Sequence, residues 1–232
     1  KEIVDSECFE IASERVIAGL EAKRLDDRER RIVAYHESGH AVVAWFLKYA
    51  NPLVKVTIIP RSKGALGFTQ YVPDNHKLHS KEHLKDMICS IFGGRIAEEL
   101  IIGSITTGAS DDLQKATSIA HAMVTKYGMS KIGLRVIPSQ GEDEIMASKP
   151  YSEKYEQKID EEVNAILEEC YQIAKDILSK NQDKLVKMAE KLLEKETIDL
   201  VDVIECLGDR PFPMEDFMKE YLDQVSDRKK QE

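Results

Sequence analysis

The stretch RIVAYHESGHAVVAWFL, residues 31–47, determines how the rest of the chain is interpreted. Its apolar residues and its two histidines recur at helical spacing, which is typical of a long amphipathic helix. Asp26, followed three residues later by Glu29, resembles a capping box that opens this helix. The Asn51-Pro52 pair is expected to end it, because proline disfavours helix in the residue before it. The residues that define the stripe are Ile32, Val33, His36, His40, Val43 and Leu47.

The segment His36-Glu37-Ser38-Gly39-His40 is an H-E-x-x-H pattern. Histidines four residues apart lie one helical turn apart on the same face, so both imidazoles can hold one ion. Glu37 then lies beside the metal, where it can accept a proton from a water whose pKa zinc lowers from 15.7 to about 7. The pattern arises by chance in roughly one such chain in a hundred. It predicts a metal site with Glu37 as the general base.

A catalytic zinc site needs a third protein ligand and one open position. The metzincin extension requires Gly and His where this chain has Val43 and Phe46, which excludes that class. Glu98, near the end of a helix-like segment, and Asp112, at the start of the next, both remain open as the third ligand. Aspartate is also favoured in the first turn of a helix, so one of Asp111-Asp112 could serve the helix and the other the metal. Four more histidines remain as candidates: His76, His79, His83 and His121.

The remaining sequence predicts a mainly α fold with a small β-hairpin or sheet. β-rich segments at 53–59 and 66–72 predict a hairpin, with room for another strand. Gly93-Gly94 disfavours helix by about 1 kcal/mol per glycine, which predicts a close approach between its helix and the metal helix. A loop is expected at 128–150. Helices are expected at roughly 5–23, 80–100, 110–127, 151–179, 183–195 and 197–207.

Composition excludes several classes of protein. The net charge of −9 over 232 residues offers no basic face for nucleic acid. The four cysteines form no CxxC pair, so no cysteine zinc site is indicated. No apolar run approaches the roughly 20 residues that span a bilayer. No G-x-x-x-x-G-K-[ST] motif occurs, so a P-loop ATPase would have to lie in another segment.

Three motifs in the same order resemble the FtsH family of membrane AAA zinc metalloproteases. They are AYHESGHA at 34–41, FGGRIAEE at 92–99 and TTGASDDL at 106–113. The resemblance runs from about residue 9 to residue 207. ALGFTQY at 65–71, KPYS at 149–152 and RPF at 210–212 are most similar to the mitochondrial paraplegin-like branch.

The resemblance implies a helical zinc-peptidase domain that holds one Zn²⁺ per chain through His36, His40 and Asp112. It implies a capping or supporting role for Asp111, and for Glu98 a role in orienting a ligand. The implied activity is hydrolysis of peptide bonds in unfolded or membrane proteins, with Glu37 as the base. The alternative is a catalytically inactive assembly or binding domain of the same fold.

The resemblance also implies a longer parent protein. Residues 1–25 would end an ATPase lid or linker helix, residues 26–207 would form the peptidase domain, and residues 208–232 a C-terminal tail. ATP would be used by a module outside this segment, in a homo- or hetero-hexamer. The parent would lie in the mitochondrial inner membrane, or alternatively in a bacterial cytoplasmic membrane. Membrane contact would come through other segments, and this segment is expected to be soluble.

A protease that degrades unfolded chains must hold them without reading each side chain. An exposed strand edge does so through main-chain hydrogen bonds. The segment Gly67, Phe68, Thr69, Gln70 and Tyr71 is the predicted edge because its strand pattern is broken by glycine and lies close in sequence to the metal helix. The alternative is an ordinary structural hairpin.

Overall fold

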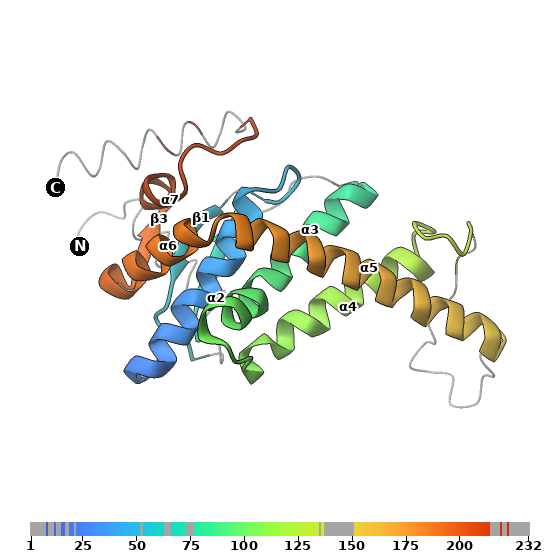
Figure 1. Cartoon of the computed structure of the whole chain (residues 1–232), viewed down its shortest axis with the longest axis horizontal. Coiled ribbons are helices and arrows are strands. Elements are labelled where there is room, and N and C mark those ends of the chain that lie inside the picture. The colour runs from blue at the N-terminus through green and yellow to red at the C-terminus, as the bar shows by residue number, and fades with distance from the viewer. Residues whose placement is uncertain are drawn as a thin grey trace.

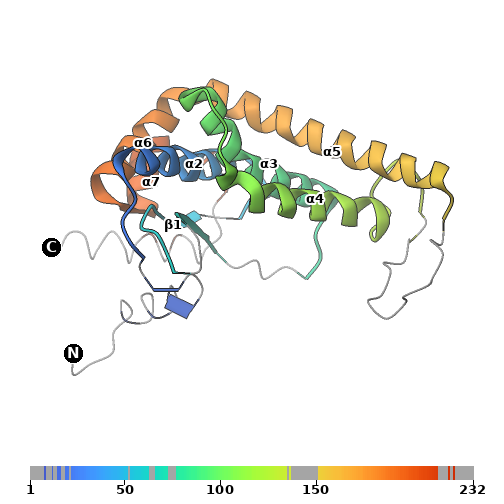
Figure 2. The same cartoon turned by 90° about the horizontal axis from the view of Figure 1, so that it is seen from below.

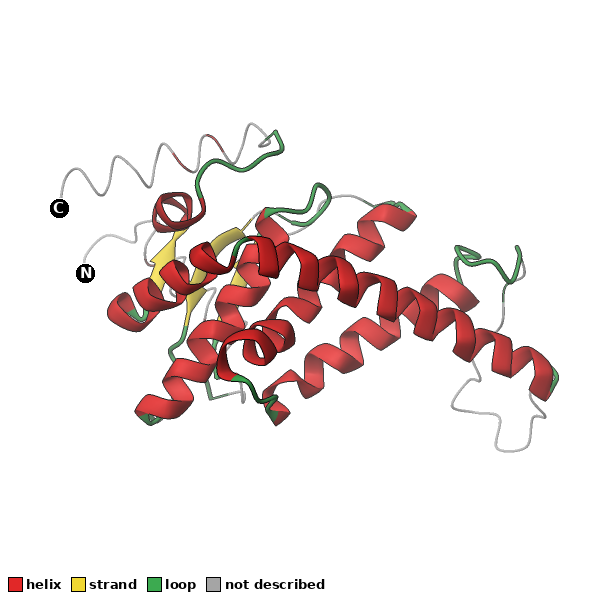
Figure 3. Cartoon of the chain, viewed as in Figure 1, coloured by secondary structure: helices red, strands yellow, loops and turns green. Residues whose placement is uncertain are grey.

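The computed structural model confirms a mainly α architecture with a small antiparallel sheet (Figures 1 and 3). Most of the helix expected at 5–23, most of the loop at 128–150 and most of the tail after 213 fall outside the described residues. The structure describes residues 8, 12, 15–16, 19–20, 22–51, 53–62, 66–72, 77–134, 136, 151–213, 219 and 222.

Helix α2, Asp27–Trp45, lies at the centre of the fold and is buried along most of its length. It begins where the sequence predicts, because the Asp26 carboxylate accepts a hydrogen bond of 2.8 Å from the Glu29 amide. It packs against α3, Lys81–Ala97, at a glycine contact. A Cβ on Gly39 would lie 2.2 Å from the Gly93 carbonyl oxygen, and a Cβ on Gly93 would lie 2.4 Å from the Gly39 carbonyl oxygen. The close approach predicted from the glycine pair is therefore confirmed.

The sheet has the strand order β2-β1-β3, with both pairings antiparallel. Strands β1, Leu53–Thr57, and β2, Phe68–Tyr71, form the predicted hairpin but are shorter than expected. The third strand is β3, Thr197–Asp199, which the sequence pattern wrongly assigned to a helix. Helix α6 stops at Glu196, whose φ of 58° is left-handed. The next three residues pair with β1, and the Asp199 side chain then caps α7, Leu200–Leu207.

Helix α3 does not simply end where the predicted helix ends. It widens into a π-helical turn, η1, over Glu98–Ile102, which stops at Gly103 with φ 73°. A short 3₁₀ turn, η2, follows at Thr107–Ala109 and leads into α4, Ser110–Thr125. Turns of the π type often occur at functional sites, and this one changes the direction of the chain between two of the predicted motifs.

The long helix α5, Glu153–Lys180, crosses α3 and α4, and α6, Gln182–Lys195, packs on α2. Figure 2 shows the sheet below the helical layer, with α5 extending away from it. Cys89, Cys170 and Cys206 are buried in this packing as free thiols. Across the described segments, no helix is both long enough and apolar enough to cross a membrane.

We predict that Gly39→Ala lowers the free energy of unfolding of the metal-free protein by about 1–3 kcal/mol or more. Alanine improves intrinsic helix propensity by only about 1 kcal/mol, which the overlap with the Gly93 carbonyl outweighs. Urea unfolding under a chelator measures the change. Gln114→Ala, on an exposed face of α4, is the control and should stay within about 0.5 kcal/mol. Equal stability of the two variants would contradict the glycine contact.

Candidate metal centre

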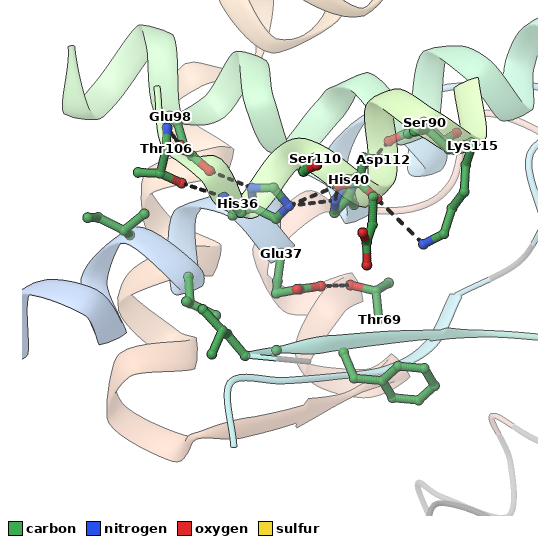
Figure 4. Close-up of a pocket in the computed structure, with 18 of the residues that line it drawn as sticks. His36, Glu37, His40, Thr69, Ser90, Glu98, Thr106, Ser110, Asp112 and Lys115 are labelled. Carbon is green, nitrogen blue, oxygen red and sulfur yellow. Dashed lines mark hydrogen bonds and ion pairs between the residues drawn. The ribbon is translucent and has the colours of Figure 1, made fainter. Parts of the chain in front are cut away.

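His36 and His40 on α2 and Asp112 on α4 point at one another in the structure (Figure 4). The His36 and His40 Nε2 atoms are 3.0 Å apart, and each lies 3.1 Å from the Asp112 Oδ2 atom. Among the described residues, these three form the one cluster of three or more side chains that could hold a metal ion. Asp112 lies in the first turn of α4, where the η2 turn delivers it to the histidines.

This donor set fits zinc. Two imidazoles and one carboxylate, with one position left open, are ligands that catalytic zinc takes. Bonds of about 2.0–2.1 Å at tetrahedral angles hold ligand atoms about 3.3 Å apart, which is close to the observed separations. Gly94 leaves the required space, because a Cβ there would lie 2.5 Å from the His36 Nε2 atom and 2.6 Å from that of His40.

The other ring nitrogen of each histidine has its own partner. His36 Nδ1 lies 2.7 Å from Glu98 Oε1, and His40 Nδ1 lies 2.9 Å from the Ser90 carbonyl oxygen. Glu98 is only 1% exposed, and its second oxygen accepts a 2.7 Å hydrogen bond from the Thr106 amide. These contacts orient both rings so that the Nε2 atoms face each other.

Two carboxylates control the charge of His36. Burial lowers the pKa of His36, but hydrogen bonds with Asp112 and Glu98 outweigh burial and raise it to about 10. Burial raises the pKa of the Asp112 carboxyl, but the hydrogen bonds with both histidines lower it well below its usual range. Without a metal, His36 therefore carries a proton at neutral pH. A metal ion must displace this proton to bind.

Glu37 is 8% exposed and lies between the histidine pair and strand β2. The Thr69 hydroxyl donates a 2.6 Å hydrogen bond to Glu37 Oε2. A Cβ on Gly67 would lie 2.7 Å from both Cγ and Oε1 of Glu37, so any larger residue there would displace the Glu37 side chain. Glu37, Gly67 and Thr69 line a cavity of about 1000 Å³ that also reaches His36 and His40. Burial raises the pKa of Tyr71 in the same cavity, and the charges of Glu37 and Asp112 raise it further.

The structure separates the two candidates for the third ligand. Asp112 faces the Nε2 atoms of both histidines, whereas Glu98 contacts only Nδ1 of His36. Asp111 is exposed in the first turn of α4, whose N-cap is Ala109. The remaining histidines lie elsewhere or, in the case of His76, outside the described residues. His79 packs on His83 at the start of α3, and His121 is bonded by Thr125 on α4.

Several supporting groups at the site leave little signal in the amino-acid sequence. The Ser90 carbonyl and the Thr106 amide are main-chain atoms, which leave no trace in residue type. The pair of contacts that Tyr171 and Lys175 of α5 make with Glu99 was also missed. Thr69 was predicted only as part of the substrate strand. Its small, β-branched side chain facing the H-E-x-x-H helix could have indicated contact with Glu37.

Several proteins similar to this chain are named as proteases or protease components. A model described as Peptidase family M41 matches residues 23–206. The ATP-dependent zinc metalloprotease FtsH of Rhodothermus marinus is 48% identical over 91% of this chain and 31% of its own length. The mitochondrial inner membrane m-AAA protease component AFG3L1 of Mus musculus is 46% identical over 93% of this chain and 28% of its own length. The component YTA10 of Saccharomyces cerevisiae is 47% identical over 94% and 29%. The chain thus spans less than a third of these relatives.

We predict that zinc affinity rises with pH between pH 7 and 9, by up to about tenfold per unit, because His36 must lose its proton. The metal-free protein should change in the opposite direction. The ordinary pKa of histidine is 6.5, and in the folded protein the pKa of His36 is raised to about 10. The protonated His36 therefore stabilises the fold fully below pH 6.5, and this stabilisation is lost as the pH rises toward about 10. Competition with a chelating dye measures affinity, and urea unfolding measures stability.

Glu98→Gln is the matched variant for this experiment. It removes one of the two carboxylates that hold the His36 proton, so both pH dependences should become shallower. If the zinc affinity of the unmodified chain does not change with pH, His36 does not carry a proton in the metal-free protein.

Proposed function

The chain belongs to peptidase family M41, and from this we propose that residues 26–207 form the zinc-dependent endopeptidase domain of a longer ATP-dependent protease. One observation carries the proposal: two imidazole Nε2 atoms and a carboxylate oxygen lie within 3.1 Å of one another, beside the buried Glu37. Relatives that match 90% or more of this chain include two named ATP-dependent zinc metalloproteases, which supports the proposal.

We infer that His36, His40 and Asp112 hold the zinc ion. When bound, zinc acts as a Lewis acid on the scissile carbonyl and lowers the pKa of its water to about 7. Glu98 and the Ser90 carbonyl orient the two imidazoles from behind. Asp111, an acidic residue in the first turn of α4, would support the start of that helix without contacting the ion.

In this proposal Glu37 moves the proton. Its carboxylate accepts a proton from the attacking water and delivers it to the amine nitrogen of the departing peptide. The cavity beside it provides room for an extended chain. No nucleophilic side chain is required, so the reaction has no covalent intermediate with the protein.

Strand β2 is proposed as the site where the substrate backbone binds. β2 is an edge strand of the sheet and pairs with β1 along its inner edge. It passes next to the Glu37 side chain. An extended peptide paired with this edge would pass in front of the histidines. Main-chain pairing suits a protease that acts on unfolded chains of many sequences.

The features of the parent protein are proposals of the same kind. The family match at 23–206 supports the proposed limits of the peptidase domain. Residues 1–25 would continue from an ATPase module, and residues 208–232 would form a tail. ATP use, a homo- or hetero-hexamer and a membrane anchor would belong to the whole protein. Two relatives are named as mitochondrial inner membrane components, which favours that location, and the bacterial FtsH keeps the alternative open.

A catalytically inactive assembly domain is the second candidate. It is disfavoured because the four side chains that the chemistry needs are all present and adjacent: His36, Glu37, His40 and Asp112. Zinc content and cleavage of casein, measured on the same sample, separate the two candidates.

Three substitutions test the roles. Glu37→Gln should keep zinc but lower kcat by about 10²–10⁴-fold, because the ligands remain and the proton carrier is lost. Loss of a group that only supports a metal ligand typically weakens metal binding by about 10–100-fold. Asp112→Ala should weaken zinc binding by more than this, because it removes a proposed ligand. Asp111→Ala is the matched control, with a change below about fivefold. Zinc titration and peptide hydrolysis report both properties.

An active Glu37→Gln variant would refute the role of Glu37. Equal losses of zinc in the two aspartate variants would refute the assignment of Asp112.

The strand proposal predicts that Phe68→Pro or Gln70→Pro lowers peptide cleavage about tenfold or more, because proline removes a main-chain donor from β2. A second arm leaves the protein unchanged and methylates single amide nitrogens of a peptide substrate. Each methylation that removes a bond to β2 should lower kcat/KM about twofold to tenfold. Cleavage that survives both proline substitutions would show that the hairpin is only structural.

A further inference from the structure

The Glu37 carboxylate is held by a strand that is distant in sequence. Thr69 Oγ1 donates to Glu37 Oε2 at 2.6 Å across 32 positions, and no other described residue makes a hydrogen bond with this carboxylate. On the other side of the same carboxylate, Gly67 approaches so closely that a Cβ would lie 2.7 Å from Oε1. Two residues of one short segment therefore set the position of Glu37.

Thr69 can do this without giving up its place in the sheet. Side chains stand roughly perpendicular to a strand, whereas main-chain groups point along the plane of the sheet. Thr69 pairs with Val56 of β1 on one side, and its hydroxyl points away from the sheet toward Glu37 (Figure 4). Within the described residues, no strand pairs with the outer edge of β2.

A simpler role for the contact is to satisfy a buried carboxylate, which is unfavourable without a hydrogen-bond donor. That role alone would affect stability and leave catalysis unchanged once the protein is folded. The geometry indicates more, because the carboxylate that is held is the proposed general base and the strand that holds it is the proposed substrate site.

We propose that Thr69 is a positioning residue for Glu37, so that β2 holds the base and the substrate backbone in one common frame. The inference rests on the proposed function. A peptide paired with β2 takes its position from that strand, and Glu37 takes its position from the Thr69 hydroxyl on the same strand. Displacement of a catalytic group by about 1 Å can lower a rate by about 10²-fold, so this contact affects the chemical step.

The test compares Thr69→Val with Thr69→Ser. Valine keeps the branched shape that packs in the strand and removes the donor, whereas serine keeps the donor and removes a methyl group. In Thr69→Val, kcat should fall about 10–100-fold. KM should change less than about threefold, because the main chain of β2 is intact. Thr69→Ser should recover kcat to within about threefold of the unmodified chain, and all three proteins should bind zinc with equal affinity.

A readout independent of activity tests the contact itself. In the zinc-free protein, Thr69→Val should lower the midpoint of thermal unfolding, and it should do so much less when Glu37→Ala is already present. Additive shifts would overturn the contact.

The kinetic outcomes separate the inference from the proposed function. If the unmodified chain cleaves peptide and Thr69→Val retains its full kcat, the inference is overturned and the proposed function stands. Thr69→Ser as impaired as Thr69→Val would also overturn it, since shape would then matter and the hydroxyl would not. An inactive unmodified chain that binds zinc would overturn both.

Discussion

The site depends on the contact between two glycines where α2 crosses α3. Helix α2 contributes both histidines and Glu37, whereas α3 brings the Ser90 carbonyl, Gly94 and, through the π-helical turn, Glu98. With larger residues at Gly39 or Gly93 the helices would separate, and the groups on α3 would no longer reach the imidazoles. Gly94 has a different task, since it leaves space beside the Nε2 atoms. Two adjacent glycines thus have two functions, one in packing and one in metal access.

The sequence predicted the parts of this arrangement that follow from local spacing. The histidine pair and the capped helix depend on residues within one element, so the H-E-x-x-H spacing, the cap and the apolar stripe were sufficient to predict them. Strand β3 was missed because Thr197–Asp199 continues an apolar pattern compatible with a helix, and only pairing with β1 decides against it. The family resemblance through three motifs is confirmed by the match to family M41.

Local sequence patterns could not decide which carboxylate is the proposed third ligand. Asp112 is 76 residues from His36 in sequence, and Glu98 is 62 residues away, so spacing gives neither an advantage. Their roles separate in three dimensions because the two nitrogens of one imidazole point in opposite directions. The residue that meets Nδ1 supports the ring, and the residue that meets Nε2 faces the second histidine. The fold of η1 and η2 between them decides which carboxylate goes where.

A protease for unfolded chains must bind substrates loosely in sequence yet hold each scissile bond in one place. Side-chain pockets position a substrate only by selecting for its sequence, whereas main-chain pairing positions a chain of any sequence. Main-chain pairing with a strand brings a second requirement, because the general base must keep a fixed distance from the substrate that the strand binds. A strand has a free face as well as a free edge, and Thr69 extends from that face to Glu37. In the proposed function, one four-residue strand therefore aligns both the substrate and the base.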